Sequence, residues 1–370
     1  MNKKFTSPTS FGRLEEPNMV ENEDSLKKKV RIGNPCISSQ EQAKENYKTK
    51  QNKKMVEKYD AESIKVLEGL EGVRKQFDVI ELSNRIKKKG DILILSKQLK
   101  IRPRILSSAK DEGRILSLFP QLQKSKASIL ARLRTDRELN IFSKKYNIFE
   151  IPARKLIELV REWNNELQKN PFNLITQEEH DLILGSLMGD ASIKQRDKNS
   201  CFRVSHSIKQ NGYIHWKLNL LKNFRISEFN ESIKTIKGRE VKMISLSTDT
   251  HAIFNYYRNL FYKDSKKIIT AEILNQMNSR SLSTWICDDG SYDNSQGYII
   301  LCTNAFSLKE HELMKEFFNH KFGLDPTIGF RDGKYYYLRF KKEDSKKLIE
   351  IIKPFIHNSM RYKIGEKNGC

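Results

Sequence analysis

The chain is 370 residues long, which is enough for two domains with substantial cores. Its 68 lysine and arginine residues outnumber 46 aspartate and glutamate residues, and the formal net charge of +22 favours a polyanionic partner, above all nucleic acid. A surface kept basic for solubility, or one that docks on an anionic membrane, is the alternative. No stretch approaches about 18 consecutive apolar residues, and the five cysteines form no C-x-x-C pair, which argues against a membrane-spanning helix, a zinc site and a disulfide framework.

The N-terminal segment is predicted to have no fold of its own. Residues 1–58 are polar, rich in lysine and nearly free of hydrophobic periodicity, which indicates a disordered basic arm. The segment has no apolar signal core, and acidic residues such as Glu15, Glu21 and Asp24 argue against a transit peptide.

Residues 59–172 are predicted to form a strongly charged helical region, because apolar residues recur there at helical spacing. Two segments, Leu95–Leu106 and Phe142–Ile157, each consist of a short helical stretch, a turn and a basic helical stretch, a pattern typical of a helix-turn-helix. Two ordinary amphipathic helix pairs explain the same pattern. The region is either an additional DNA-binding module or sequence translated in frame from an upstream exon.

From residue 173 onward, helices alternate with strands that contain β-branched and aromatic residues. The first repeat, residues 173–268, begins with an apolar helix. Its further expected elements, in the order strand, strand, helix, strand, strand, helix, are Ala191–Arg196, Cys201–Ser207, Tyr213–Phe224, Ser232–Lys237, Val241–Ser247 and Ala252–Phe261.

The same order returns in the second repeat, residues 269–366, where Asp332 and Gly333 give a strong hairpin signal. After its apolar helix, the expected elements are Tyr298–Thr303, Leu308–Phe322, Thr327–Arg331, Tyr335–Lys341 and Glu343–Ile356. We therefore predict an α+β protein with a duplicated αββαββα fold and pseudo-twofold symmetry, preceded by a mainly helical N-terminal extension.

The two repeats begin with similar segments, Leu182–Ala191 and Leu282–Gly290. Each is about two turns of apolar helix that places a carboxylate, Asp190 or Asp289, at the end of the helix. A single aspartate at such a position is more often a helix terminator. Two at equivalent points of a repeat predict a shared site, because paired carboxylates bind hard cations.

Small residues recur four apart on both helices, at Gly185 and Gly189 and at Ser283 and Cys287. Such stripes allow two helix backbones to approach closely. We therefore expect the two helices to pack against each other and to bring Asp190 and Asp289 together.

Alternation along the strands predicts which residues face a nucleic acid. In the last hairpin, Tyr335, Tyr337, Arg339 and Lys341 share one face, while Leu338 lies on the other. Further candidates for contact with DNA, on the strands of the first repeat, are Lys194, Arg196, Arg203, Lys234 and Lys242.

The two acidic helix ends resemble the LAGLIDADG motifs of homing endonucleases, in the form that carries two motifs in one chain. The resemblance covers roughly residues 175–366. It includes Phe202–Ser207 and the following Lys209–Tyr213, and near the C-terminus Ile352–Ile356 and Met360–Ile364 are similar to the family's closing segment.

The resemblance implies a divalent-metal site that binds Mg²⁺ or Mn²⁺ through Asp190 and Asp289. Asp288 stands where the commonest motif has alanine, so either acid of this pair could face the metal, and the match with Asp190 favours Asp289. The family also implies a basic residue beside each scissile phosphate. Lys363 holds that position, and Lys267, with Lys266 as its rival, is the expected counterpart.

The spacing of the two lysines agrees with this assignment, since Lys267 follows Asp190 by 77 residues and Lys363 follows Asp289 by 74. The resemblance thus implies a site-specific endonuclease that hydrolyses both strands of double-stranded DNA and leaves short 3′ overhangs. The seven histidines are dispersed, which argues against an HNH nuclease.

Other proteins of the family that this chain resembles suggest two alternatives, an intron RNA maturase or a DNA-binding regulator without catalysis. Both motif acids are present, which favours the active endonuclease, although binding of intron RNA is compatible with it. The resemblance further implies a monomer that is encoded in a mitochondrion or chloroplast and has no membrane partner.

Overall fold

The computed structural model describes residues 102–236 and 238–366 and, upstream of them, Ile80, Ser83, Asn84, Ile86 and 89–98. The predicted basic arm, residues 1–58, and the first part of the predicted helical region lie outside the described residues. Among the described helices, none is long and apolar enough to cross a membrane.

The predicted helical region consists of five α-helices and a short 3-10 helix within the described residues. Both expected helix pairs are present, since α4 is followed by α5 and α7 by α8, and α8 buries one apolar side through Leu156, Val160, Trp163 and Leu167. The elements are α4 (Lys89–Gln98), α5 (Pro103–Leu118), α6 (Lys124–Leu130), α7 (Asp136–Lys145), α8 (Ala153–Leu167) and η1 (Pro171–Asn173).

A buried carboxylate joins this helical region to the first repeat. Glu138 of α7 has no exposed surface, accepts a hydrogen bond from Trp163 Nε1 at 2.9 Å and lies 3.0 Å from Nε2 of His251 in the first repeat. Burial raises the pKa of Glu138, but the charge and hydrogen bond of His251 outweigh burial and hold the pKa below its usual value. The helical region therefore packs on the first repeat through a paired, buried charge.

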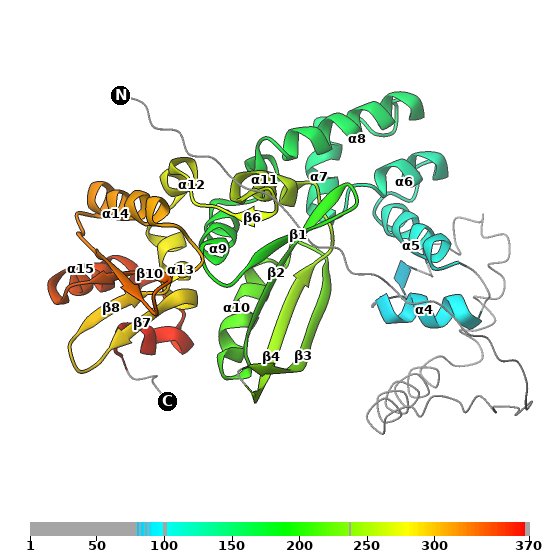
Figure 1. Cartoon of the computed structure of the whole chain (residues 1–370). Coiled ribbons are helices and arrows are strands. Elements are labelled where there is room, and N and C mark those ends of the chain that lie inside the picture. Colours follow the sequence, from blue (N-terminus) through cyan, green and yellow to red (C-terminus); the bar gives the residue numbers. More distant parts are fainter. Residues whose placement is uncertain are drawn as a thin grey trace, which may run out of the picture. The chain divides into compact units, whose positions relative to one another are not determined.

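The first repeat contains a four-stranded antiparallel sheet with strand order β1-β2-β4-β3. Helices α10 and α11 pack on one face of this sheet (Figure 1). Its elements are α9 (Gln177–Met188), β1 (Ser192–Arg196), β2 (Asn199–Ser207), η2 (Ile208–Gln210), α10 (Asn211–Leu220), β3 (Ile226–Ile236), β4 (Arg239–Thr248), α11 (Ile253–Phe261), β5 (Tyr262–Lys263) and β6 (Lys266–Lys267).

The second repeat has the equivalent strand order, β7-β8-β10-β9, with α14 and α15 packed on one face of its sheet (Figure 1). Its elements are α12 (Ala271–Gln276), α13 (Ser279–Asp289), β7 (Gly290–Asp293), β8 (Tyr298–Leu301), α14 (Leu308–Phe322), β9 (Thr327–Arg331), β10 (Tyr335–Phe340), α15 (Lys342–Ile352), η3 (Lys353–Phe355) and η4 (Asn358–Ile364). The predicted duplicated αββαββα fold is confirmed.

Among the strands, β3 and β7 differ most from the prediction. β3 begins at Ile226, six residues before its predicted start at Ser232, because pairing with β4 extends it through Glu228 and Asn230, residue types that rarely favour strands. β7 follows α13 directly at Gly290 and had no sequence signal of its own.

The central helices α9 and α13 begin with matching caps. The Thr176 hydroxyl accepts from the Glu179 backbone, and Asn278 caps α13 in the same way with Ser281 as the reciprocal partner. Every residue of α9 from Glu179 to Met188 is buried, so this helix is enclosed on all sides. These caps set the first residue of each helix, and the length of the helix then sets where its acidic end lies.

Glycine at position 185 allows α9 and α13 to touch. A Cβ atom there would lie 2.2 Å from the Ser281 carbonyl oxygen and 2.7 Å from Thr284 Cβ, and a Cβ at Gly189 would lie 2.5 Å from Asp288 Cβ. The predicted stripe on α9 is confirmed. The stripe predicted on α13 is wrong in register, since its contacts come from residues 281, 284 and 288, while the Ser283 hydroxyl points to the Phe355 carbonyl.

We expect Gly185→Ala to lower the free energy of unfolding by roughly 1–3 kcal/mol or more, because the new methyl group meets fixed backbone of α13. Gly212→Ala is the matched control, since its Cβ would come no closer than 3.6 Å to Ser359. Urea unfolding followed by circular dichroism measures both. Equal midpoints for the two variants would contradict the close approach at Gly185.

Candidate active site

The predicted metal-binding carboxylates emerge at the same end of the paired helices. Asp190 follows α9 and its side chain is 43% exposed, whereas Asp289 is the last residue of α13 and is half-buried. Burial raises the pKa of Asp289 to about 8, and the negative charges of Asp190 and Asp288 act in the same direction. The three carboxylates therefore form one electrostatically coupled group.

The two predicted lysines occupy equivalent places beside these carboxylates. Lys267 Nζ donates to the backbone carbonyls of Leu187, Gly189 and Ala191 at 2.8, 3.2 and 2.8 Å. Lys363 Nζ donates to the Gly290 carbonyl at 2.7 Å. Each ammonium group thus interacts with the carbonyl end of the acidic helix in its own repeat, where a helix favours positive charge.

Burial distinguishes Lys267 from its rival. Lys266 is exposed, whereas Lys267 is partly buried, and burial lowers the pKa of Lys267 against the opposing charges of Asp289, Asp288 and Asp190. The geometry therefore places Lys267, rather than Lys266, with the acidic group.

Asp288 is enclosed by partners from the first repeat. Its side chain has no exposed surface, and both carboxylate oxygens accept hydrogen bonds from Lys217 Nζ, at 2.8 and 2.9 Å. The Tyr213 hydroxyl donates to the same carboxylate at 2.9 Å. Lys217 is itself fully buried, so the pair is a closed internal ion pair of α10 and α13. Because Asp288 is paired with Lys217, Asp289 is the one of these two adjacent acids that can bind a ligand.

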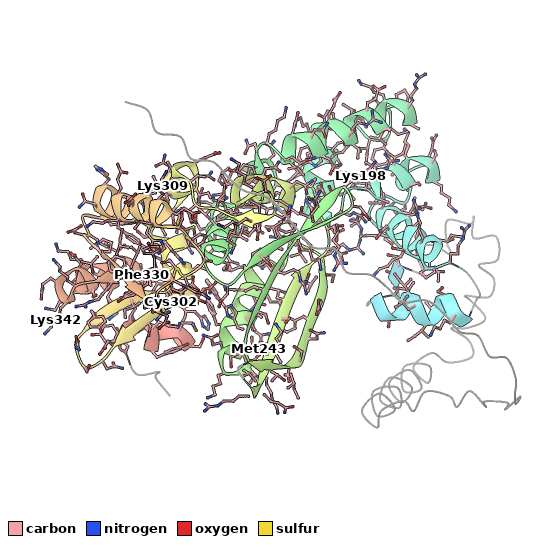
Figure 2. All side chains as sticks on the ribbon, viewed as in Figure 1. Lys198, Met243, Cys302, Lys309, Phe330 and Lys342 are labelled. Carbon is pink, nitrogen blue, oxygen red and sulfur yellow. The ribbon has the colours of Figure 1, made fainter. Side chains whose placement is uncertain are left out.

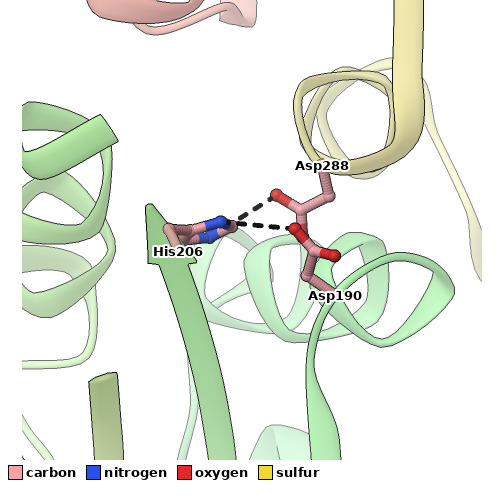
Figure 3. Close-up of side chains that lie close together, drawn as sticks. All are labelled: Asp190, His206 and Asp288. Atoms are coloured by element: carbon pink, nitrogen blue, oxygen red, sulfur yellow. Dashed lines mark ion pairs between the residues drawn. The ribbon is translucent and has the colours of Figure 1, made fainter. Parts of the chain in front are cut away.

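His206, near the end of β2, lies beside the acidic group. Its Nδ1 lies 3.3 Å from Asp190 Oδ2 and its Nε2 lies 3.8 Å from Asp288 Oδ1 (Figure 3). Neither ring nitrogen has a hydrogen-bond partner of acceptable geometry among the described residues, although the ring is buried. Ligand atoms of these three residues lie within 4.8 Å of one another, but both carboxylate oxygens of Asp288 already accept hydrogen bonds from Lys217, so Asp190 and His206 are the members of this cluster that can offer donors to a cation.

His206 also affects the charge state of its neighbour. Burial raises the pKa of Asp190, but the contact with His206, followed by the charges of Lys217 and Lys363, lowers it, and the net shift is downward. Sequence analysis missed His206, Tyr213 and Lys217. Strand alternation could have placed His206 on the buried face of β2 with Phe202, but no local pattern links it to Asp190.

Each acid opens onto a cavity at the start of its own sheet. Asp190 lines a cavity of about 240 Å³ together with Arg203 and Lys234. Asp289 lines one of about 460 Å³ together with Ser291 and Lys363. The repeat symmetry therefore extends from the acids to the surfaces beside them.

The first sheet presents most of the predicted basic residues on one face. Strand register places Lys194, Arg196, Arg203 and Lys234 on the same side, the side that bears the cavity of Asp190. Lys242, also predicted to contact DNA, lies on the opposite face of the sheet. It pairs with Ile233 and shares that face with Ile244. The first four residues, and not Lys242, share one face of the sheet, where Glu228 lies 3.8 Å from Arg203.

The second sheet presents an aromatic and basic face. Tyr335, Tyr337 and Arg339 lie on the face opposite Leu338, which confirms the predicted alternation, and Lys341 lies just beyond the strand.

Contacts between neighbours order this face. The Tyr337 ring covers Gly329, where a Cβ atom would come within 2.2 Å of it, and the Arg331 guanidinium lies 5.6 Å from the same ring. Arg339 lies 4.6 Å from the Tyr298 ring. These contacts hold planar and cationic groups at the surface, and groups of these kinds contact bases and phosphates in nucleic-acid-binding proteins.

We expect Lys217→Met to lower the free energy of unfolding by roughly 3–5 kcal/mol, because Asp288 would remain as an uncompensated buried charge. The double variant Lys217→Met, Asp288→Asn should recover a large part of this loss. Chemical denaturation of the three proteins tests the pair. A single variant as stable as the wild type would contradict a closed ion pair.

Comparisons with known proteins agree with this architecture. The profile of the LAGLIDADG DNA endonuclease family matches residues 180–348. The intron-encoded endonuclease ai4 of Dictyostelium discoideum is 40% identical over 124 residues, covering 32% of this chain and 76% of that protein. A RecA protein of Mycolicibacterium chitae is 28% identical over 206 residues, which cover 51% of this chain and 47% of that protein, so this chain spans about half the length of that relative.

Among solved structures, the homing endonuclease I-WcaI bound to its DNA recognition sequence covers 59% of this chain and 96% of its own, at 22% identity and a TM-score of 0.48. The sequence relationships carry the assignment. A relative at 40% identity is matched over more than two thirds of its length, and the family profile matches the segment from α9 to α15. The chain belongs to the LAGLIDADG DNA endonuclease family.

Proposed function

We propose that the protein is a site-specific endonuclease that hydrolyses both strands of double-stranded DNA with a divalent metal ion. The observation that carries this proposal is the placement of Asp190 and Asp289 at equivalent helix ends, each open to a cavity beside a basic or aromatic sheet face. The name of the Dictyostelium relative, an intron-encoded endonuclease, supports the same activity.

The residues present fit a hard divalent cation. Asp190 and Asp289 offer carboxylate oxygens, the donors that Mg²⁺ and Mn²⁺ prefer. Burial, and after it the negative charges of Asp190 and Asp288, raises the pKa of Asp289, and a bound cation would favour the charged form of this carboxylate. His206, whose Nδ1 lies 3.3 Å from Asp190 Oδ2, offers a nitrogen donor beside the carboxylate of Asp190. Mg²⁺ or Mn²⁺ bound there would supply activation of water and stabilisation of the leaving oxygen.

The chain's own residues provide the remaining functions. Lys267 and Lys363 hold positive charge next to the acids, where charge develops on a phosphate that undergoes hydrolysis. The basic face of the first sheet and the aromatic face of the second bind the duplex and fix the scissile phosphates over the helix ends. The ion pair with Lys217 keeps Asp288 from competing with Asp289 for the metal ion. Binding of intron RNA, a monomeric state and an organellar location stay predictions.

We expect the Asp190→Asn and Asp289→Asn variants each to lose cleavage by at least about 10²-fold while they retain DNA affinity, because only the acidic site is altered. Duplexes are first selected for binding from a randomised pool in Ca²⁺, and the selected sequences are then tested for cleavage in Mg²⁺. Asp264→Asn is the matched control, since Asp264 is an exposed turn residue with φ of 50° that asparagine tolerates.

The proposal fails if the wild type cuts no selected duplex in Mg²⁺ or Mn²⁺, or if both variants cut as well as the Asp264→Asn control.

We expect Lys363→Met and Lys267→Met to reduce the cleavage rate by roughly 10²-fold with little change in DNA affinity, because each removes one charge beside the acids. Lys266→Met, one residue from Lys267 but exposed, serves as control. Single-turnover cleavage and fluorescence anisotropy separate the rate from binding. A rate lost in Lys266→Met and kept in Lys267→Met would reverse the assignment.

A further inference from the structure

A second cationic cavity lies away from the acidic site, between the N-terminal helical region and the first repeat. It has a volume of about 550 Å³, and it is open to solvent. Six cationic side chains line it: Lys110, Arg114, Arg134, Arg137, Lys222 and Arg225. Only two carboxylates, Asp111 and Asp136, line the same cavity.

Ion pairs fix the arginines of this cavity in place. Arg225 lies 2.7 Å from Asp111, and Arg114 lies 2.7 Å from Asp136. Arg137 pairs at 2.8 Å with Glu179 of the α9 capping box. The guanidinium groups are therefore ordered before any ligand binds, which lowers the entropy cost of recognition.

The lysines of the cavity are not neutralised in this way. Among the described residues, no carboxylate lies within 4.0 Å of the ammonium group of Lys110 or Lys222. Lys110 is half-buried, and burial, together with the charge of Arg225, lowers its pKa, although Asp111 opposes the shift. Asp249 and Asp91 act in the same direction as Asp111, and a phosphate bound in the cavity would likewise stabilise the charged form of Lys110.

The cavity adjoins the surface that the acidic site uses. Lys222 and Arg225 belong to the connection between α10 and β3, and β3 is the edge strand of the first sheet. The same strand carries Lys234 to the cavity of Asp190. An extended polyanion held on the first sheet can therefore continue past the edge of β3 to the cationic cavity.

We propose that this cavity binds backbone phosphates of the DNA duplex that flanks the segment held by the sheets. The proposal rests on the proposed function for the presence of DNA on the sheets. Residues 1–58 of the chain are themselves basic and therefore electrostatically unsuited to this cavity. The helical region thereby acts as an additional phosphate-binding surface, fixed to the first repeat by Glu138 and His251.

The test uses the full-length protein and a fluorescein-labelled 40-base-pair duplex of arbitrary sequence, with EDTA present to prevent cleavage. Affinity is measured by anisotropy between 50 and 300 mM KCl for the wild type and for Lys110→Ala, Lys222→Ala. Each lost phosphate contact should reduce the slope of log affinity against log salt by about 0.9, so the double variant should lose about 1–2 in slope.

The control removes the same charge elsewhere. Lys309→Ala, Lys347→Ala alters two exposed lysines on α14 and α15, which pack on the second sheet, and neither lysine has an ion pair among the described residues (Lys309 is labelled in Figure 2). Its slope should equal that of the wild type. The proposal is overturned if the slopes of the two double variants agree.

A charge reversal distinguishes a binding role from a structural one. Lys110→Glu reverses the charge in the cavity, so it should weaken DNA binding and flatten the salt slope more than Lys110→Ala does, while circular dichroism shows a folded protein. A folded Lys110→Glu variant with the affinity and slope of the wild type would contradict the proposal. The binding assay contains EDTA, so its result does not depend on cleavage. If the slope changes but the wild type cuts no DNA in the Mg²⁺ assay, only the proposed endonuclease activity is rejected. If the wild type cuts DNA but the slope does not change, only the phosphate-binding cavity is rejected.

Discussion

The contact between α9 and α13 is the constraint on which the rest of the structure depends. Gly185 leaves no side chain between its backbone and the Ser281 carbonyl, and the two helices meet at that point. Because both helices begin at defined caps and end about three turns later, this contact also sets where their C-terminal ends lie. This contact therefore positions the acids, the lysines that bind the last carbonyls of the two helices, and the first strand of each sheet.

The pseudo-symmetry is broken at one position, with a chemical consequence. Where the first motif has Gly189, the second has Asp288, and the absent side chain at Gly189 leaves the room that Asp288 fills. Burying this carboxylate would be costly without a counter-charge, and α10 supplies Lys217 and Tyr213 for it. His206, also from the first repeat, contacts both Asp190 and Asp288. The polar groups around the acids thus come mainly from one repeat, so the two halves of the site are chemically different.

Much of the fold could be predicted from local patterns. Alternation assigned the two faces of β10, and the similar spacing from Asp190 to Lys267 and from Asp289 to Lys363 predicted lysines that lie at equivalent helix ends. Residues that depend on long-range pairing could not be found in this way. Lys217 meets Asp288 across 71 positions of sequence, and nothing local marks either as a partner of the other.

The same reason explains the errors. The side of α13 that faces α9 depends on how the helices cross, so the stripe of Ser283 was chosen in place of that of Thr284. The face of Lys242 depends on its pairing with Ile233 across the hairpin rather than on its own strand.

The central claim is that Asp190 and Asp289 act as one site. Binding of Mn²⁺ to the protein–DNA complex, measured by the electron paramagnetic resonance signal of the free ion, tests it through a double-mutant cycle of Asp190→Asn and Asp289→Asn. The account predicts that either substitution removes most of the tight Mn²⁺ binding and that the double variant loses little more. Additive losses from two independent sites, or tight binding that persists in the double variant, would contradict it.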